Sequence, residues 1–351
     1  MSRANWICEA SASGPYAGVA LRHITPIAIA IAVIASSSRE IGTAPPGRHR
    51  AAAATSGSRP ELFGAGTIST PANELNAAFS PDGRTVYFTR TVGDGGRFGV
   101  ILESGSMPNE RWRTPVVASF SGRYADYDPF VAPDGSRLFF ISNRPRVAGR
   151  EPERDFDIWV VERAGAEWGS PSNVGAPVNS DGDELYPTVA SDGTLYFSSC
   201  GRRDSRGRCD LYRSRFRDGR YLEPESLGDS VNTPASETDA YVAPDQSYLV
   251  YAVYGRADAA GNGDLYVSFS HDGVWSAARH LGPEINTVAR EYCPIVSPDG
   301  RYLYFTSQYG APDVARARAL TFAELRDSLA TVRNGFGNVY RVPIGVLRDQ
   351  Q

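Results

Sequence analysis

Five acidic residues recur at one position of a repeated pattern, seven residues before the start of a Pro-Asp or closely related turn. They are Glu74, Asp126, Glu184, Glu237 and Glu291. Carboxylates that converge on one site can bind a cation or polar ligand, or supply the acid and the base that hydrolyse a glycosidic bond. Two residues further on, the repeat becomes individual and reads Asn76, Asp128, Tyr186, Asp239 and Cys293. Asp128 and Asp239 are therefore the strongest candidates for contact with a ligand.

A structural interpretation of the five acids competes with a functional one. A position repeated in every unit suits a task that every unit shares, such as capping a loop or pairing with a neighbouring arginine or backbone N–H. We favour this interpretation and retain the five acids, after Asp128 and Asp239, as candidate ligand-binding residues. The same reasoning predicts that Asn179, Asn232 and Asn286 hold their turns.

The elements that position these residues follow from the spacing of the turns. The turn aspartates are separated by 52, 58, 53 and 54 residues, which suits a four-stranded antiparallel blade; they are Asp82, Asp134, Asp192, Asp245 and Asp299. In each unit an apolar run before the turn predicts an inner strand A, and an alternating run after it predicts strand B. Strands C and D follow outward.

The fifth unit ends after its strand C, and the segment "GAGTISTPANELNAAFSPDG" from Gly64 aligns without a gap to "LGDSVNTPASETDAYVAPDQ" from Leu227. The N-terminal segment is therefore predicted to supply the missing strand D, which removes an exposed sheet edge. We predict an all-β fold, a single five-bladed β-propeller of four-stranded antiparallel blades over residues 58–351. A sixth blade would have little sequence left to form it.

These repeats resemble the WD-like repeats of the Pro-Asp type found in TolB-like exported bacterial propeller proteins. The resemblance is clearest from Trp168 to Ser198 and, with substitutions, from Trp275 to Ser307, and it extends over nearly the whole predicted propeller. It implies the fold. It says little about function, because such propellers serve as scaffolds, ligand binders and regulatory domains.

In such a propeller the B-C and D-A loops share one face, and here the B-C loops are long and variable. The last of them, at about 310–336, contains Thr321 and Glu324 at capping-box spacing and a helical apolar stripe. We predict a short helix that either partly covers the acidic face or packs on the rim of the last blade. Arginines in these loops could neutralise the acids or bind an anionic ligand.

The N-terminal region predicts export. Residues 24–35 form an apolar run too short to span a membrane, which indicates a signal peptide at 1–38, followed by a flexible linker at 39–57. We expect a periplasmic or secreted protein without a stable membrane span in its mature form. Cys200 and Cys209 bracket a short polar loop, and either a disulfide or two free thiols fits the sequence. Cys293 is expected to be buried and inert.

Composition and motifs limit the function. A net charge of -4 argues against a nucleic-acid surface. The sequence has no nucleophile elbow, zinc-binding helix or phosphate loop, so we assign no catalytic residue, metal or cofactor. We predict a monomeric, non-enzymatic binding or scaffold module that engages a protein, peptide or cell-envelope glycan through its B-C/D-A face. The alternative is a glycoside hydrolase that uses channel carboxylates, although acids in similar environments poorly separate their pKa values.

Overall fold

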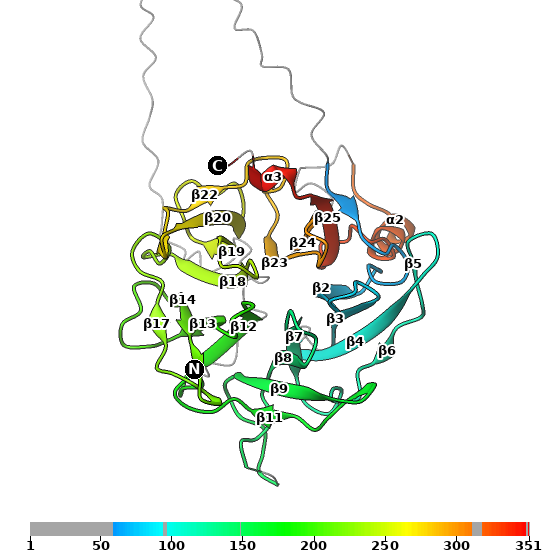
Figure 1. Cartoon of the computed structure of the whole chain (residues 1–351). Helices are drawn as coiled ribbons and strands as arrows, with labels where there is room; N and C mark the ends of the chain where they lie inside the picture. Colours follow the sequence, from blue (N-terminus) through cyan, green and yellow to red (C-terminus); the bar gives the residue numbers. More distant parts are fainter. Residues whose placement is uncertain (1–58, 94–96, 148, 311–317, 349, 351) are drawn as a thin grey trace, which may run out of the picture.

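Five antiparallel blades surround a central axis in the computed structural model, which describes residues 59–351 except 94–96, 148, 311–317, 349 and 351 (Figure 1). The predicted five-bladed, all-β propeller is thus confirmed. The predicted signal peptide and linker lie outside the described residues. The elements, in blade order from the axis outward, are β2 (Asn73–Phe79), β3 (Thr85–Val92), β4 (Phe98–Met107), β5 (Arg111–Trp112) and β6 (Val116–Val117); β7 (Asp126–Val131), β8 (Arg137–Ser142), β9 (Asp157–Ala164), β10 (Glu167–Trp168) and β11 (Ser172–Asn173); β12 (Asp183–Val189), β13 (Leu195–Cys200), β14 (Cys209–Ser214), β15 (Phe216–Arg217), β16 (Arg220–Tyr221) and β17 (Glu225–Ser226); β18 (Ser236–Val242), β19 (Tyr248–Tyr254), β20 (Asp264–His271), β21 (Val274–Trp275) and β22 (Arg279–His280); and β23 (Glu291–Val296), β24 (Tyr302–Ser307), β25 (Asn338–Pro343) and β1 (Glu61–Leu62), with α2 (Phe322–Leu329) and α3 (Gly345–Arg348).

The Pro-Asp turns join strands A and B as their sequence suggests. Asp82 accepts hydrogen bonds from the Ser80 hydroxyl and the Arg84 N–H, and the following Gly83 has a positive φ of 68°. Such an Asx-type turn, followed by a residue free to adopt positive φ, reverses the chain within a few residues. Strand D, by contrast, is broken into short segments, so the blades are regular near the axis and irregular at the rim.

The chain closes into a ring in the last blade, where the N-terminal strand β1 adds to the edge of β25 (Figure 1). Leu62 pairs with Tyr340, and the Phe63 N–H donates to the Val339 carbonyl at 2.8 Å. The predicted closure by an N-terminal outer strand is therefore confirmed. It satisfies backbone groups of β25 that an open array would leave as an exposed edge.

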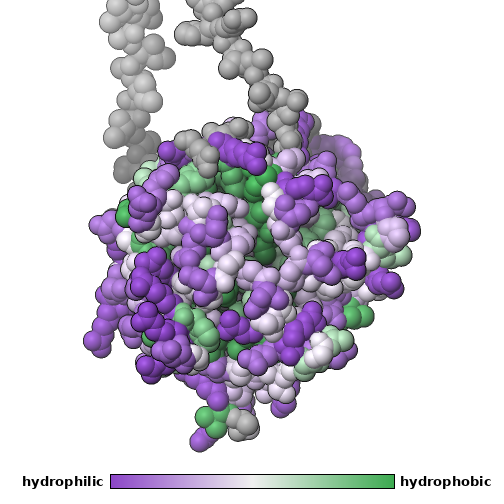
Figure 2. Space-filling view, viewed as in Figure 1, coloured by the Kyte–Doolittle hydropathy of each residue, from purple (hydrophilic) through white to green (hydrophobic). Residues whose placement is uncertain are grey.

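Aromatic side chains of strand D seal one blade against the preceding blade. The indole of Trp168 packs edge-on against Tyr87 with ring centroids 6.2 Å apart, and its N–H donates to the Tyr87 hydroxyl at 3.0 Å. Trp275 packs edge-on against Tyr196 with centroids 6.3 Å apart, without the corresponding hydrogen bond. The rim of the face in Figure 2 is hydrophilic, and hydrophobic surface is visible towards its centre.

The predicted helix is present as α2. The Thr321 side chain caps the N-terminus by accepting a hydrogen bond from the Glu324 N–H. The Glu324 carboxylate accepts one from the Thr321 N–H, which completes the capping box. None of the residues of α2 is buried, so the apolar stripe of the helix is exposed. No helix in the described part of the chain is both long and apolar enough to cross a membrane.

Cys200 and Cys209 lie directly opposite each other at the ends of β13 and β14 and are joined by a disulfide, with their Cα atoms 4.1 Å apart. The structure thus decides between the two alternatives that the sequence left open. Cys293 is free and buried, as expected.

Replacing both bridged cysteines, in the variant Cys200→Ser/Cys209→Ser, should lower the free energy of unfolding by about 3 kcal/mol, because the cross-link restricts the unfolded chain. Chemical denaturation measures the change. A reducing agent should destabilise the wild type by a similar amount and leave the double variant unaffected. Equal midpoints for wild type and variant would show that the bridge contributes nothing.

Candidate functional site

The repeated acids cap the D-A loops. All five side chains are fully buried. In four units the carboxylate accepts both the N–H and the hydroxyl of the Ser or Thr four residues earlier; Glu74, for example, takes the Thr70 N–H at 3.0 Å and its hydroxyl at 2.5 Å. The same pair of bonds links Ser180 to Glu184, Thr233 to Glu237 and Thr287 to Glu291. These contacts support the structural interpretation of the ring.

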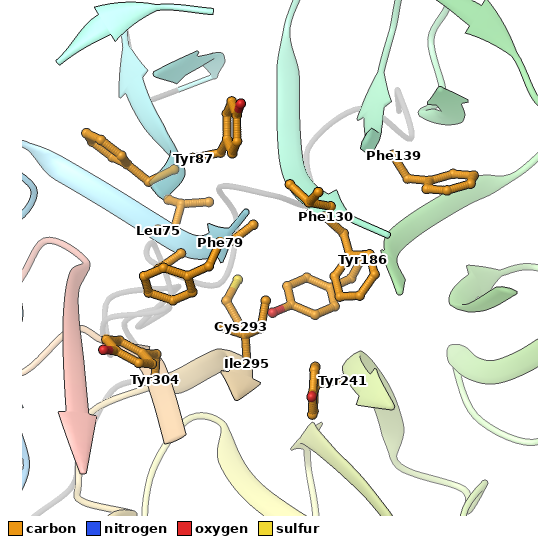
Figure 3. Close-up of a cluster of buried hydrophobic side chains, with 14 of the residues drawn as sticks. Leu75, Phe79, Tyr87, Phe130, Phe139, Tyr186, Tyr241, Cys293, Ile295 and Tyr304 are labelled. Atoms are coloured by element: carbon orange, nitrogen blue, oxygen red, sulfur yellow. The ribbon is translucent and has the colours of Figure 1, made fainter. Parts of the chain in front are cut away.

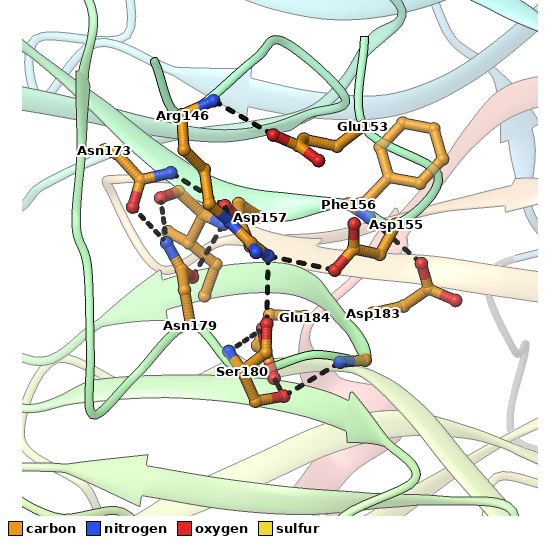
Figure 4. A network of polar contacts seen from close by, with 12 residues as sticks. Arg146, Glu153, Asp155, Phe156, Asp157, Asn173, Asn179, Ser180, Asp183 and Glu184 are labelled. Carbon is orange, nitrogen blue, oxygen red and sulfur yellow. Dashed lines mark hydrogen bonds and ion pairs between the residues drawn. The ribbon is translucent and has the colours of Figure 1, made fainter.

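Several arginines form ion pairs with the repeated acids or with other acids near the same loops. Arg144 contacts Asp126 at 2.7 Å, and its guanidinium is itself nearly buried. Arg90 contacts Glu74 at 2.9 Å. In Figure 4 Arg146 spans a blade joint, bonding Asp157, Asp155 and the Ser180 carbonyl. These guanidinium groups are engaged internally and hold the loops together.

The three recurring asparagines clip each D-A loop to strand C of the same blade. The Asn232 amide accepts the Leu211 N–H and donates to the Leu211 carbonyl, both at 2.9 Å. Asn179 makes the same two bonds to Ile158, and Asn286 makes them to Leu265. One side chain thereby replaces a ladder partner where strand D is interrupted, which agrees with the predicted turn-holding role.

The individual positions near the axis share a backbone conformation that the sequence analysis did not anticipate. All five have φ between 50° and 54°, and strand A shifts register at each of them; they are Asn76, Asp128, Tyr186, Asp239 and Cys293. Each is therefore the centre of a β-bulge. Asn and Asp tolerate positive φ, whereas Tyr and Cys rarely do. The presence of Asn or Asp at three of the five positions was the sequence signal that could have indicated the bulges.

The bulges turn these side chains into the channel, which is filled. Figure 3 shows Tyr186 reaching towards Cys293 and Ile295 across the axis, and the Tyr186 hydroxyl donates to the Pro294 carbonyl at 2.7 Å. Phe130 and Tyr241 are buried beside them. As a result Asp128 and Asp239 are only 8% and 9% exposed. The structure brings the two strongest candidates together but leaves them little contact with solvent.

Burial and mutual repulsion set the electrostatics of this acid pair. Burial raises the pKa of Asp128 well above its usual range, and the charge of Asp239 raises it further. Burial also raises the pKa of Asp239, while the Arg290 guanidinium and the Cys293 N–H oppose the shift. Both pKa values therefore lie above the usual range of an aspartate, because burial disfavours the charged form.

Arg290 is a channel residue that the sequence analysis missed. Its Nε and Nη2 donate to the Tyr254 hydroxyl at 3.1 and 3.0 Å, and its guanidinium lies over the rings of Tyr254 and Tyr292. The charge of Asp239 contributes to raising the pKa of Arg290. Arg290 directly precedes the repeated acid Glu291. The other units carry different residue types at the position of Arg290, so the repeat did not indicate a role for it. Among the described residues, no three His, Cys, Asp or Glu side chains are placed to hold a metal ion.

No protein-family model and no curated protein sequence matches the chain. Its fold is similar to solved structures that include a protein assigned as a TolB from Agrobacterium tumefaciens, at 16% identity over 82% of this chain and 98% of that one, with a TM-score of 0.45. Others are an α-L-arabinofuranosidase from Lactobacillus brevis (12% identity, 80% and 94% covered, TM-score 0.46) and a glycoside hydrolase (13%, 82% and 91%, 0.49). At these identities the similarity concerns the fold alone.

The buried acids should make stability fall as the pH rises. Burial raises the pKa of Glu237 from 4.5 to about 7, with the nearby charge of Asp210 adding to the shift. Between these values the folded state binds a proton that the unfolded chain releases, so the contribution present below pH 4.5 is lost as the pH rises through 7. The wild type should therefore lose on the order of 2 kcal/mol of its free energy of unfolding over this pH range, and Glu237→Gln should not show this loss.

Thermal unfolding at pH values from about 5 to 8 tests this linkage. The exposed Glu284 provides a matched control, because Glu284→Gln should leave the pH profile of the wild type unchanged. A profile that is equally steep in Glu237→Gln would mean that Glu237 remains charged in the folded protein.

Proposed function

We propose that this protein is an exported, non-enzymatic and monomeric binding module that captures a protein or peptide through its B-C/D-A loop face. The observation that carries the proposal is the concentration of exposed apolar side chains on this face. Large apolar patches on a protein surface commonly mark interaction sites. The residues are Val147, Val288, Tyr309, Leu320, Phe322, Leu325, Leu329 and Phe336.

Six of these eight residues lie in the insertion between β24 and β25 that carries α2. Phe322, Leu325 and Leu329 repeat at helical spacing and are 81%, 43% and 53% exposed. A helix of eight residues gains little stability by itself, and this one relies on its capping box and not on packing. An amphipathic helix with an unburied stripe suits the helix-in-groove mode of recognition, in which such side chains enter an apolar groove of the partner.

The disulfide between Cys200 and Cys209 supports export, because disulfides persist in oxidising compartments outside the cytosol. It agrees with the signal peptide inferred from the sequence. A periplasmic or secreted location is therefore part of the proposal.

Glycoside hydrolysis remains the alternative, and the acid pair of Asp128 and Asp239 is the observation in its favour. They form a pair of buried carboxyls near the axis, both with raised pKa values, and a glycosidase needs two carboxyls as acid and base. Hydrolysis needs both groups to reach the glycosidic oxygen and the sugar ring. Tyr186 and Cys293 occupy the channel beside them, so a substrate would have to displace packed side chains. This favours the binding module.

A photo-crosslinking amino acid at position 322, tested in cells, should form an adduct with one partner, because this side chain stands free on the proposed surface. The same amino acid at Val274, which is 69% exposed on the opposite face, serves as control and should not form it. Adding Leu325→Ser and Leu329→Ser should abolish the adduct. The purified partner should then bind the serine variant at least about tenfold more weakly than the wild type.

Identical adducts from positions 322 and 274, or an adduct that survives both serine substitutions, would place the binding surface elsewhere. The melting temperature of the serine variant should equal that of the wild type, since neither leucine is buried.

A screen of chromogenic glycosides tests the alternative function. Wild type and Asp239→Asn should both be inactive, because the filled channel excludes substrate. Hydrolysis by the wild type that disappears in Asp239→Asn would establish a hydrolase and overturn the non-enzymatic assignment.

A further inference from the structure

A cavity of about 850 Å³ lies at the seam between the last blade and the first. It is lined by residues of the A-B turns and of the β4-β5 hairpin, so it opens on the face opposite to α2. Five aromatic side chains form part of its wall: Phe63, Phe79, Trp112, Tyr302 and Tyr304. Its volume falls in the range of pockets that bind small molecules.

The cavity exists because the seam is packed differently from two other blade joints. At those joints Trp168 and Trp275 lie directly on a tyrosine of the preceding blade and are 8% and 6% exposed. At the seam Phe63 of the closing segment lies between the two partners, 4.9 Å from the Tyr304 ring and 5.5 Å from the Trp112 ring. Trp112 is only partly buried and forms part of the cavity wall.

The polar part of the wall carries balanced charge. It contains three carboxylates and three guanidinium groups, and several are held in ion pairs: Arg341 contacts Glu110 at 2.8 Å, and Arg301 contacts Asp299 at 2.6 Å. The remaining members are Asp82 and Arg111. Neither an anion nor a cation meets an excess of opposite charge here. The ion pairs instead present donors and acceptors side by side.

Glu110 lies at the rim of this cavity and has a backbone conformation that residues with a side chain rarely adopt. It has φ 54° at the last position of the hairpin turn, where the third and fourth blades have Gly219 and Gly273. Residues with a side chain seldom adopt this conformation, and such strain clusters at functional sites. Its carboxylate crosses the seam to Arg341 and forms one edge of the cavity.

We propose that this cavity binds a neutral sugar of one or two rings. The apolar face of a sugar ring can stack on the exposed part of Trp112. Each hydroxyl group is both a donor and an acceptor, which matches a wall of paired carboxylates and guanidinium groups. The balanced charge disfavours charged ligands. This site lies on the face opposite to the proposed protein-binding surface and does not depend on it.

Isothermal titration with cellobiose, maltose and N,N′-diacetylchitobiose tests the proposal, with glucuronic acid and glucosamine as charged probes. At least one neutral disaccharide should bind saturably to the wild-type protein, and neither charged probe should bind as well. Glu110→Gly and Trp112→Ala should each weaken that binding by at least about tenfold.

Asp218→Gly is the matched control, because Asp218 also has positive φ in a C-D hairpin but borders no part of this cavity. It should leave sugar binding unchanged. Glu110→Gly should melt at or above the wild-type temperature, which separates lost binding from lost folding. Crosslinking from position 322 should be unaffected by Glu110→Gly, so the two proposals can fail separately.

Three results would overturn the proposal: no saturable binding of any neutral sugar, equal binding by wild type and both cavity variants, or tighter binding of a charged probe. In the second case Glu110 would serve only to join the first and last blades.

Discussion

Closure of the ring by the pairing of β1 with β25 is the constraint on which the rest of the structure depends. A row of blades ends in exposed strand edges, and only a returning strand can satisfy the last one. Here the return is made by a segment that precedes the first blade, so the last blade combines three strands that follow the other blades with one strand that precedes them.

The closure also makes one blade joint unlike two of the others. Phe63 follows β1 directly and packs against both Trp112 and Tyr304, whereas Trp168 and Trp275 each pack against a tyrosine of the preceding blade. The partly exposed Trp112, the strained Glu110 and the cavity that they line all lie at this joint. A repeat protein made of near-identical units thus acquires an individual site where symmetry is broken by the route of the chain. The insertion that carries α2 breaks the symmetry a second time, on the other face and in the same last blade.

The repeated acids show that a conspicuous sequence pattern can have a structural role. Glu74, Glu184, Glu237 and Glu291 each bind a loop four residues away, and burial raises the pKa of each. A carboxylate that is sealed from solvent and saturated with local hydrogen bonds has little capacity left for a ligand. Variation between the units was the better guide to positions with a role of their own, and it indicated Asp128 and Asp239. Their neighbours in the channel, however, limit their access to solvent.

The sequence by itself determined the number of blades, the closing strand, the turns, the capped helix and the position of the repeated acids. Each of these depends on local chemistry or on a period that can be read along the chain. Tertiary structure alone decided that Cys200 and Cys209 are bridged, that Arg290 lies beside Asp239, that the channel is filled and that a cavity opens beside Trp112. These features depend on distances between side chains of different strands, and often of different blades, and on whether a neighbour fills or leaves a space. No spacing in the sequence encodes such distances, because they arise only when the ring has closed.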